Sequence, residues 1–187
     1  MKYEDFDLNL LDSDYLILDV EATGLGNNDQ IIELSIIDKN GQVVFDKLIK
    51  ATVPITDSAF AVHGISEGEL GDKPLWNDVM EEVYALINGR IVFMYNARFD
   101  AEILVRSFET FNYPIPSFSA VCVAEWYANY FGARVRYRDK KAAQSLENAA
   151  KQQGIERVGN AHRALSDANL TFDLLTIVAE QQKLYMS

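Results

Sequence analysis

The chain has 187 residues, of which 49% are hydrophobic and 24% charged, and its formal net charge is −11. This length and apolar content predict one globular domain over residues 1–187 and exclude a disordered chain. The negative balance argues against non-specific duplex binding through a broad basic face, although a small local site can still bind nucleic acid.

The cellular setting is inferred from what the sequence contains. The single cysteine, Cys122, lies in an apolar run that is expected to be core, and one cysteine fits a reducing cytoplasm. The first residues do not have the pattern of a signal peptide, and no apolar run is long enough to span a membrane. We therefore expect a cytoplasmic protein without a membrane partner.

Three consecutive stretches near the start of the chain predict β-strands. The first begins at Tyr15 and is broken at Thr23-Gly24, and the others cover 30–38 and 43–49. An Asn-Gly pair between the last two suits a hairpin turn, because both residues tolerate positive φ. The short connections predict an antiparallel meander with the first strand innermost.

The rest of the chain alternates helices with strands. The predicted helices cover 74–87, about 100–111, 124–131, 145–153 and 161–183, and the predicted strands cover 90–95 and 118–123. A meander followed by alternating elements predicts an α/β fold, with a mixed five-stranded sheet flanked by helices.

Two acids interrupt the first predicted strand. Asp19 and Glu21 are two positions apart, so their side chains point the same way. Two like charges at the end of a core strand are unfavourable, and a divalent cation held between them would offset that repulsion. The alternative is a solvated turn beyond the strand end, and this stretch alone does not decide between them.

Two other places put acids where an apolar element does not need them. Asp100 follows the fourth strand, and Asp167 lies on the apolar last helix, five residues after His162. Taken singly, Asp100 is typical of a helix cap, Asp167 of a solvated helix face, and His162 of a surface residue.

Together these residues resemble the DEDD superfamily of 3′–5′ exonucleases. Three motifs in chain order carry the resemblance, which runs from 16 to about 175: Asp19-Val-Glu-Ala-Thr-Gly24, Asn96-Ala-Arg-Phe-Asp100 and His162-Arg-Ala-Leu-Ser-Asp167. The sister subgroup has Tyr four residues before the last Asp, where this chain has Arg163. The chain is therefore similar to the histidine (DEDDh) subgroup, which includes the proofreading exonucleases of the bacterial DNA polymerase III epsilon type. This resemblance implies a ribonuclease H-like fold.

The resemblance also implies a set of catalytic roles. Asp19, Glu21, Asp100 and Asp167 would hold two divalent metal ions, Mg²⁺ or Mn²⁺, and two ions about 4 Å apart suit phosphodiester hydrolysis. His162 would be the general base, since histidine titrates near neutrality. Its five-residue spacing from Asp167 does not stack on one helix face, so we expect it on a loop or in the first helical turn.

Further residues are candidates for binding the 3′ end of a strand. They are Ala22, Thr23, Gly24, Leu25, His63, Ile65, Asn96 and Phe99. Backbone groups of the first three can contact a 3′ hydroxyl, and the larger apolar side chains can pack on terminal bases. Core packing is the alternative for the isoleucine and the phenylalanine. For the histidine, contact with a phosphate and support of its own loop are both open.

A basic segment lies between two of the predicted helices. Arg134, Arg136 and Arg138 belong to 134–141, where Tyr137 is interleaved with the cations. Such a segment suits the backbone of a single strand. A solvated loop in an acidic protein explains it equally well.

These observations predict a metal-dependent 3′–5′ exonuclease that acts on 3′ ends of single-stranded nucleic acid and releases nucleoside 5′-monophosphates. DNA is favoured, and an RNA-trimming or oligoribonucleotide exonuclease is the alternative, because no residue can be placed against a 2′ hydroxyl. A polymerase-associated proofreading or scaffold subunit is a third reading, although a pure scaffold has no need of clustered acids. A polymerase or another nucleic-acid enzyme stays open as a partner, and the oligomeric state is not predicted.

Overall fold

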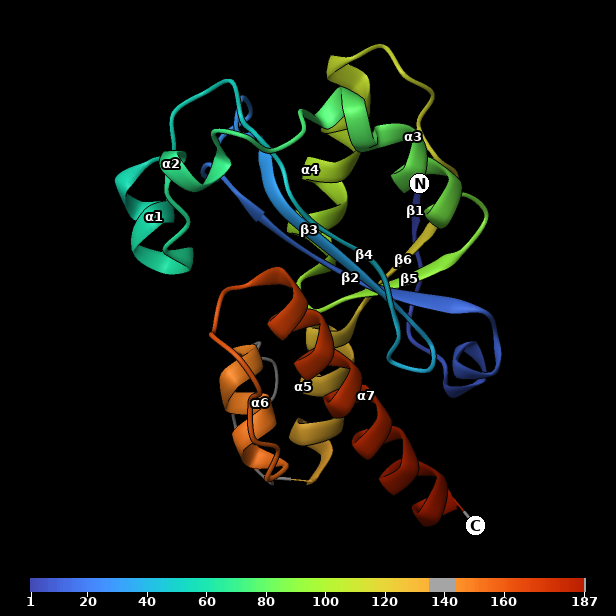
Figure 1. The fold of residues 1–187 in the computed structure, drawn as a ribbon. Helices are drawn as coiled ribbons and strands as arrows, with labels where there is room; N and C mark the ends of the chain where they lie inside the picture. Colours follow the sequence, from blue (N-terminus) through green and yellow to red (C-terminus); the bar gives the residue numbers. More distant parts are fainter. Residues whose placement is uncertain (135–143, 187) are drawn as a thin grey trace.

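The computed structural model describes residues 1–134 and 144–186. Within them a mixed sheet of six strands runs in the order β1-β6-β5-β2-β3-β4 (Figure 1). The strands are β1 Lys2–Tyr3, β2 Tyr15–Ala22, β3 Ile31–Asp38, β4 Val43–Leu48, β5 Ile91–Met94 and β6 Ser119–Cys122. β2, β3 and β4 pair antiparallel, whereas β5 is parallel to β2 and β6 is parallel to β5.

The predicted meander and mixed sheet are confirmed, and the sheet has one strand more than the five expected. β1 contributes only Lys2–Tyr3, which pair parallel to β6 at Ser119 and Ala120. Two residues are too few to show an alternating pattern, so the sequence predicted a leading segment here. β2 lies between β3 and β5, which confirms that the first strand of the meander is an inner one.

The hairpin between β3 and β4 is built by its own polar residues. Asp38 Oδ1 accepts hydrogen bonds from the backbone N–H groups of Asn40 (2.9 Å) and Gln42 (2.8 Å). Gly41 has φ of 74°, which is a conformation that favours glycine. The turn predicted from the Asn-Gly pair is therefore confirmed.

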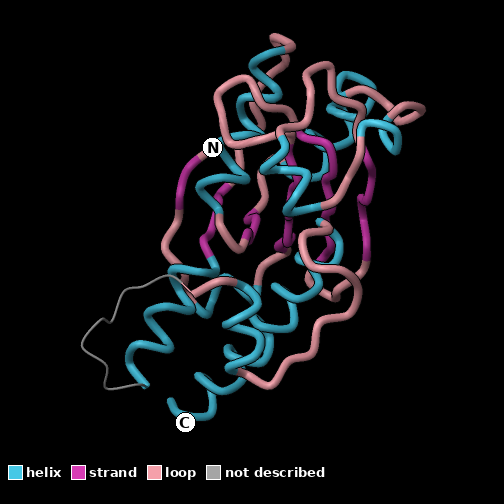
Figure 2. Tube along the Cα trace, turned by 90° about the vertical axis from the view of Figure 1, so that its left-hand side faces the viewer, coloured by secondary structure: helices cyan, strands magenta, loops and turns pink. Residues whose placement is uncertain are grey.

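Helices cover both faces of the sheet (Figures 1 and 2). The helices that pack on these faces are α3 Trp76–Ile87, α4 Ala97–Thr110, α5 Val123–Arg134, α6 Leu146–Gln152 and α7 Ala164–Met186. The first two pack on one face and the last three on the other. Three short helices lie in the connections: η1 Leu8–Asp12, α1 Asp57–His63 and α2 Glu67–Leu70.

Side-chain alternation along β2 decides which face each residue serves. Leu16 and Leu18 belong to the hydrophobic cluster under α3 and α4, and Ile17 belongs to the cluster under α5, α6 and α7. Asp19 and Glu21 continue the alternation of Ile17. The two acids therefore extend toward the α7 side of the sheet.

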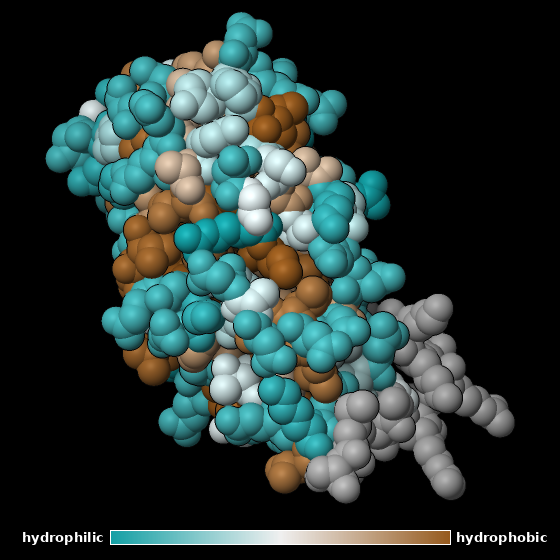
Figure 3. All heavy atoms as spheres, turned by 90° about the vertical axis from the view of Figure 1, so that its right-hand side faces the viewer, coloured by the Kyte–Doolittle hydropathy of each residue, from teal (hydrophilic) through white to brown (hydrophobic). Residues whose placement is uncertain are grey.

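The surface is mixed in polarity. Figure 3 shows one face, on which hydrophobic side chains interrupt a mainly hydrophilic surface, as is normal for folded domains. Cys122 is half-buried and packs against the α3–α4 cluster, as its apolar surroundings predicted. Among the helices that the structure describes, none has the length and apolar character needed to cross a membrane.

Candidate active site

The central strand supplies the first two acids. Asp19 and Glu21 of β2 face Ser35 and Glu33 of β3 across the antiparallel pair. The register shifts directly after Glu21, where Ala22 pairs with Ile31. A shift of this kind bends a strand and re-aims its side chains. The strand end therefore turns away from the sheet just beyond the two carboxylates.

The third acid comes from the start of α4. Asp100 is buried in the first turn of that helix, and its Oδ1 accepts a hydrogen bond from the Val20 backbone N–H at 3.3 Å. β5 ends at Met94 and pairs with β2 only as far as Ile17, so no strand partner reaches Val20 on this edge. Asp100 thus takes the place of a strand partner and is held beside Asp19.

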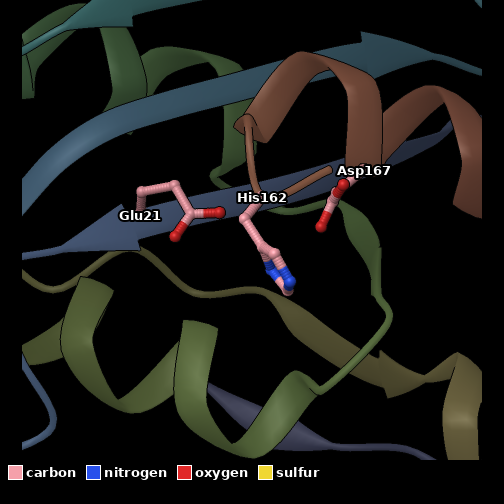
Figure 4. A group of neighbouring side chains, drawn as sticks. All are labelled: Glu21, His162 and Asp167. Carbon is pink, nitrogen blue, oxygen red and sulfur yellow. The ribbon is translucent and has the colours of Figure 1, made fainter. Parts of the chain in front are cut away.

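The last helix supplies an acid and a histidine. Asp167 is buried in the first turn of α7, and the exposed His162 lies in the turn just before that helix. Glu21, His162 and Asp167 each offer one possible ligand atom, and these three atoms lie within 4.8 Å of one another. Figure 4 shows His162 between the two carboxylates. The expected position of His162, ahead of the helix, is confirmed.

The carboxylates of this cluster influence one another strongly. Burial, with the charges of Asp167 and Glu33, raises the pKa of Glu21 to about 8. Burial likewise raises the pKa of Asp100 to about 7, against the hydrogen bond from Val20. Burial and then the neighbouring acids raise the pKa of Asp19 well above its ordinary value. Keeping these groups ionised together therefore requires positive charge nearby.

A divalent cation fits this donor set. Carboxylate oxygens are the ligands that hard cations prefer, and imidazole is also a common metal ligand. The atoms of Glu21, His162 and Asp167 converge closely enough to share one ion, and the raised pKa values mark a site of concentrated negative charge. The four predicted ligand acids are thus brought together from β2, α4 and α7.

One cation of the protein already contacts the cluster. Arg157 is largely buried in the segment between α6 and α7, and its guanidinium donates to Asp167 and to Glu147 of α6. It also donates to Ser166 Oγ at 2.9 Å. Sequence reasoning missed Arg157, because nothing in its local pattern links a loop arginine to an acid ten residues later.

A second ion pair holds the turn that carries His162. Arg163 Nε donates to Glu33 Oε1 at 3.0 Å and to Oε2 at 3.1 Å, and Arg163 Nη2 donates to Oε1 at 2.6 Å. The Ala164 backbone N–H donates to Glu33 Oε2 at 2.9 Å. Sequence reasoning missed this ion pair. It considered Arg163 only because the sister subgroup has tyrosine at that position, and it did not single out Glu33.

The turn after β2 is organised by its own residues. Thr23 is fully buried; its backbone N–H donates to the Gln30 carbonyl at 2.9 Å, and its carbonyl accepts from the Thr56 N–H at 2.9 Å. Thr23 Oγ1 donates to Asp29 at 2.7 Å. The Thr23 N–H and carbonyl therefore both make hydrogen bonds within the turn, and contact of the Thr23 backbone with a 3′ hydroxyl stays a prediction. The neighbouring buried Ala22 and Gly24 stay candidates.

Two expectations about the substrate are corrected. Ile65 is fully buried and packs with Ile32 and Leu70, so it offers no surface to a base. His63 is 7% exposed, and its Nδ1 accepts a hydrogen bond from the Ile65 N–H at 3.0 Å. The core-packing and loop-supporting alternatives therefore describe these two residues, since neither side chain faces solvent.

Other candidates keep an accessible surface. Leu25 is 87% exposed, and Phe99 is half-buried against the α3–α4 cluster. Asn96 is exposed at the N-cap of α4, where its side chain makes no capping hydrogen bond. All three remain predictions for contact with a strand end.

The basic segment is only partly described. Arg134 is the last residue of α5, but its side chain, like all of Arg136 and Arg138, lies outside the described residues. Their expected role stays a sequence prediction.

A pocket of about 260 Å³ lies apart from the cluster. Trp76 and Arg106 are among its lining residues, and none of the predicted site residues lines it. The acid cluster and this pocket are therefore separate features of the structure.

The fold and the site define the class of protein. A ribonuclease H-like α/β sheet carries acids on its central strand and at the starts of two helices, with a histidine in front of the last helix. The family described as Exonuclease (RNase_T) matches residues 16–175. The chain is 30% identical over 176 residues to the uncharacterized exonuclease CP81 of Escherichia phage 186, covering 91% of this chain and 90% of that protein.

Other relatives agree with this match. DNA polymerase III subunit epsilon of Pasteurella multocida is 29% identical, with 91% of this chain and 70% of that protein covered. Exonuclease X, solved in complex with 5′ overhanging duplex DNA, has a TM-score of 0.65 at 23% identity, covering 90% of this chain and 92% of that one. A complex of Escherichia coli exonuclease I with single-stranded DNA has a TM-score of 0.79 at 20% identity, covering 91% of this chain and 41% of that one.

The chain therefore belongs to the exonuclease family. The predicted resemblance to DEDD 3′–5′ exonucleases of the epsilon type is confirmed, and the protein is an enzyme of the 3′–5′ exonuclease type. The structural neighbours confirm the ribonuclease H-like fold.

Proposed function

We propose that this domain, residues 1–187, is a metal-dependent exonuclease that shortens single-stranded DNA from its 3′ end and releases nucleoside 5′-monophosphates. The convergence of Glu21, His162 and Asp167 within 4.8 Å supports this proposal above all other observations. Glu21 on β2 is far in sequence from His162 and Asp167 at the start of α7, and packing alone does not require these groups to meet.

The acids have one role in this scheme. Asp19, Glu21, Asp100 and Asp167 are the residues that would hold divalent ions, with Mg²⁺ or Mn²⁺ as the candidates. Two such ions supply charge stabilisation and activation of water when they are bound. The chain contributes the frame, since α4 and α7 pack on opposite faces of the sheet that contains β2 and hold the carboxylates in place.

His162 has the role of general base. An attacking water forms a new P–O bond, the bond from phosphorus to the 3′ oxygen of the preceding nucleotide breaks, and that oxygen leaves with a proton from solvent. His162 accepts the proton that the water loses. Its exposed position between Glu21 and Asp167 leaves the imidazole accessible to a water at the cluster.

The remaining candidate residues suit the end of a strand. Leu25 and Phe99 offer apolar surface on which terminal bases can pack. Packing of this kind does not depend on which base is present. Asn96 offers an amide, and Arg134, Arg136 and Arg138 offer positive charge to a phosphate backbone.

The choice of DNA rests on the relatives. The epsilon subunit belongs to a DNA polymerase, and both structural neighbours named above were solved with DNA. RNA trimming is the alternative outcome of the experiment below, and an active subunit within a polymerase assembly is compatible with the same chemistry. Cytoplasmic location stays a prediction from the single cysteine.

The test is a time course on 5′-labelled single strands of DNA and RNA with one common sequence. Reactions contain Mg²⁺, Mn²⁺ or EDTA, and the parent is compared with His162→Ala and Asp167→Asn. Asp72→Asn is the matched control, because this acid is exposed and lies outside the cluster. We expect a ladder that shortens from the 3′ end, requires metal, and is lost in both site variants but not in the control.

The two substrates separate the readings. A faster rate on DNA supports the proposal, and a faster rate on RNA replaces it with the RNA-trimming alternative. Full cleavage by Asp167→Asn, or cleavage in EDTA equal to that in Mg²⁺, would contradict the metal-ligand assignment.

A further inference from the structure

The Glu33–Arg163 pair lies directly beside the acid cluster. Glu33 stands opposite Glu21 in the β2–β3 register, on the sheet face that α7 covers. Its side chain is 6% exposed, while that of Arg163 is 35% exposed. An acid this buried and this close to the cluster is either a ligand, a source of repulsion or a partner for a cation.

The hydrogen bonds of Glu33 are directed to the segment after His162. Arg163 Nε and Nη2 donate three hydrogen bonds to the two carboxylate oxygens, at 2.6 to 3.1 Å. The Ala164 N–H, one of the unpaired donors at the start of α7, adds a fourth hydrogen bond at 2.9 Å. Glu33 therefore caps α7 and neutralises Arg163 with one carboxylate.

The residue just before this anchor has an unusual backbone. His162 has φ of 57°, in the left-handed region that residues other than glycine rarely adopt. Such a conformation persists where the surrounding structure holds it, and here the next two residues are both bound to β3. The backbone conformation in turn decides where the imidazole points, which is between Glu21 and Asp167.

We propose that Arg163 and Glu33 are positioning residues that hold the turn of His162, and so place its imidazole against the catalytic carboxylates. This inference rests on the proposed function of His162 and adds the device that orients it. Neither residue touches the reacting atoms. The strand β3 thereby controls the general base through an ion pair 130 residues apart in sequence.

The decisive experiment is an epistasis measurement with His162. Arg163→Met keeps the apolar stem and removes the guanidinium, and it is made in the parent and in His162→Ala. Arg90→Met is the matched control: Arg90 is 37% exposed and pairs with Asp14 at 2.9 Å, away from the site. kcat and KM are measured on the preferred single strand.

We expect Arg163→Met to lower kcat about 10- to 100-fold with KM changed less than about threefold, since small misplacements of a catalytic group have effects of this size. In the His162→Ala background the same substitution should change kcat less than about twofold. An equal loss in both backgrounds, or no loss in the parent, overturns the inference.

A second readout does not depend on activity. The chain has two histidines, so the His162 signals are assigned by comparing NMR spectra with His162→Ala. Arg163→Met should lower the backbone heteronuclear NOE of residue 162, and Arg90→Met should not. An unchanged NOE in Arg163→Met contradicts the positioning role even if the parent proves to have no nuclease activity.

The variants also guard against a folding defect. Removing Arg163 leaves Glu33 buried without its partner, which is destabilising, so Arg163→Lys and the double variant Glu33→Gln/Arg163→Met are included. Arg163→Lys keeps the charge but loses the forked contact, and its kcat should fall between those of the parent and Arg163→Met. A lysine variant as fast as the parent contradicts the role of the forked contact.

The two proposals fail separately. Full activity of His162→Ala refutes the general base of the proposed function. Loss of activity in His162→Ala together with parental kcat in Arg163→Met refutes only the positioning role.

Discussion

At the scale of single residues, the acids of the site outnumber the cations that contact them. Asp19 feels the charges of Asp100, Asp167 and Glu21, all of which raise its pKa after burial itself. Arg157 contacts Asp167 alone among these acids, and Arg163 neutralises Glu33. The cluster therefore keeps excess negative charge, which is the property that a divalent cation requires.

Asp19→Asn tests this repulsion directly. We expect the substitution to abolish cleavage and, in EDTA, to raise the thermal midpoint by about 2–6 °C, because it removes a half-buried acid from a set of like charges. Thermal unfolding in EDTA by circular dichroism is the measurement, with Asp72→Asn as control. A midpoint lower than the parent's would mean that Asp19 stabilises the fold without a metal.

His162→Ala separates a base from a ligand. The imidazole lies within 4.8 Å of two carboxylate atoms, so its position alone suits either role. If it is a base, the variant should lose at least about 100-fold in kcat while Mn²⁺ binds as tightly as to the parent. Mn²⁺ titration followed by electron paramagnetic resonance measures that affinity. A large fall in Mn²⁺ affinity would assign His162 to the ligand set.

At the scale of elements, the turn after β2 shows how a motif residue serves structure before chemistry. Thr23 and Asp29 bind each other, and Asp29 also accepts from the Gly26 N–H. A Cβ on Gly24 would lie 2.6 Å from Asp29 Oδ2 and 2.9 Å from Asp29 Cγ. The glycine of the first motif is therefore explained by a close approach between two arms of this turn.

Gly24→Ala should destabilise the protein for this reason. The carboxylate of Asp29 cannot move away without losing its bond to Thr23, so we expect a loss of about 1–3 kcal/mol in the free energy of unfolding. Urea unfolding measures this change. Gly68→Ala is the control, because a Cβ there meets only Ser66 Oγ at 3.7 Å. Equal stability of Gly24→Ala and the parent would show that the turn adapts freely.

At the scale of the whole molecule, the acid cluster gives the fold a dependence on pH. The net charge is −11, and the groups with raised pKa lie between the sheet and its helices, with Asp100 buried and Asp19 and Glu21 half-buried. An acid whose pKa is raised in the folded state binds its proton more tightly there than in the unfolded chain. Raising the pH therefore favours unfolding across the interval between the two pKa values.

We expect the thermal midpoint in EDTA to fall between about pH 5 and pH 8 as the pH rises. On folding, the pKa of Glu21 rises from its ordinary value of 4.5 to about 8, and that of Asp100 rises from 3.8 to about 7. Glu21→Gln should flatten the upper part of this dependence, since an amide does not titrate. Midpoints measured in EDTA across this range test it, and a midpoint that rises toward the alkaline end would contradict the raised pKa values.

Local patterns explain how much of this was predictable. Continuous apolar runs and an Asn-Gly turn predicted β2, β3 and β4, because these depend on neighbours in sequence. The three spaced motifs predicted Asp19, Asp100 and Asp167 as members of one site. β1 escaped prediction, since its two residues become a strand only through their pairing with β6.

The sequence by itself determined the α/β class, the order of the elements and the acids of the site, because periodicity and motif spacing are properties of the chain. Only the tertiary structure decided that Ile65 and His63 are buried, that the Thr23 backbone makes hydrogen bonds within its turn, and that Glu33 forms an ion pair with Arg163. These outcomes depend on contacts between segments as far as 130 residues apart in sequence. A local sequence pattern does not predict which distant segments meet.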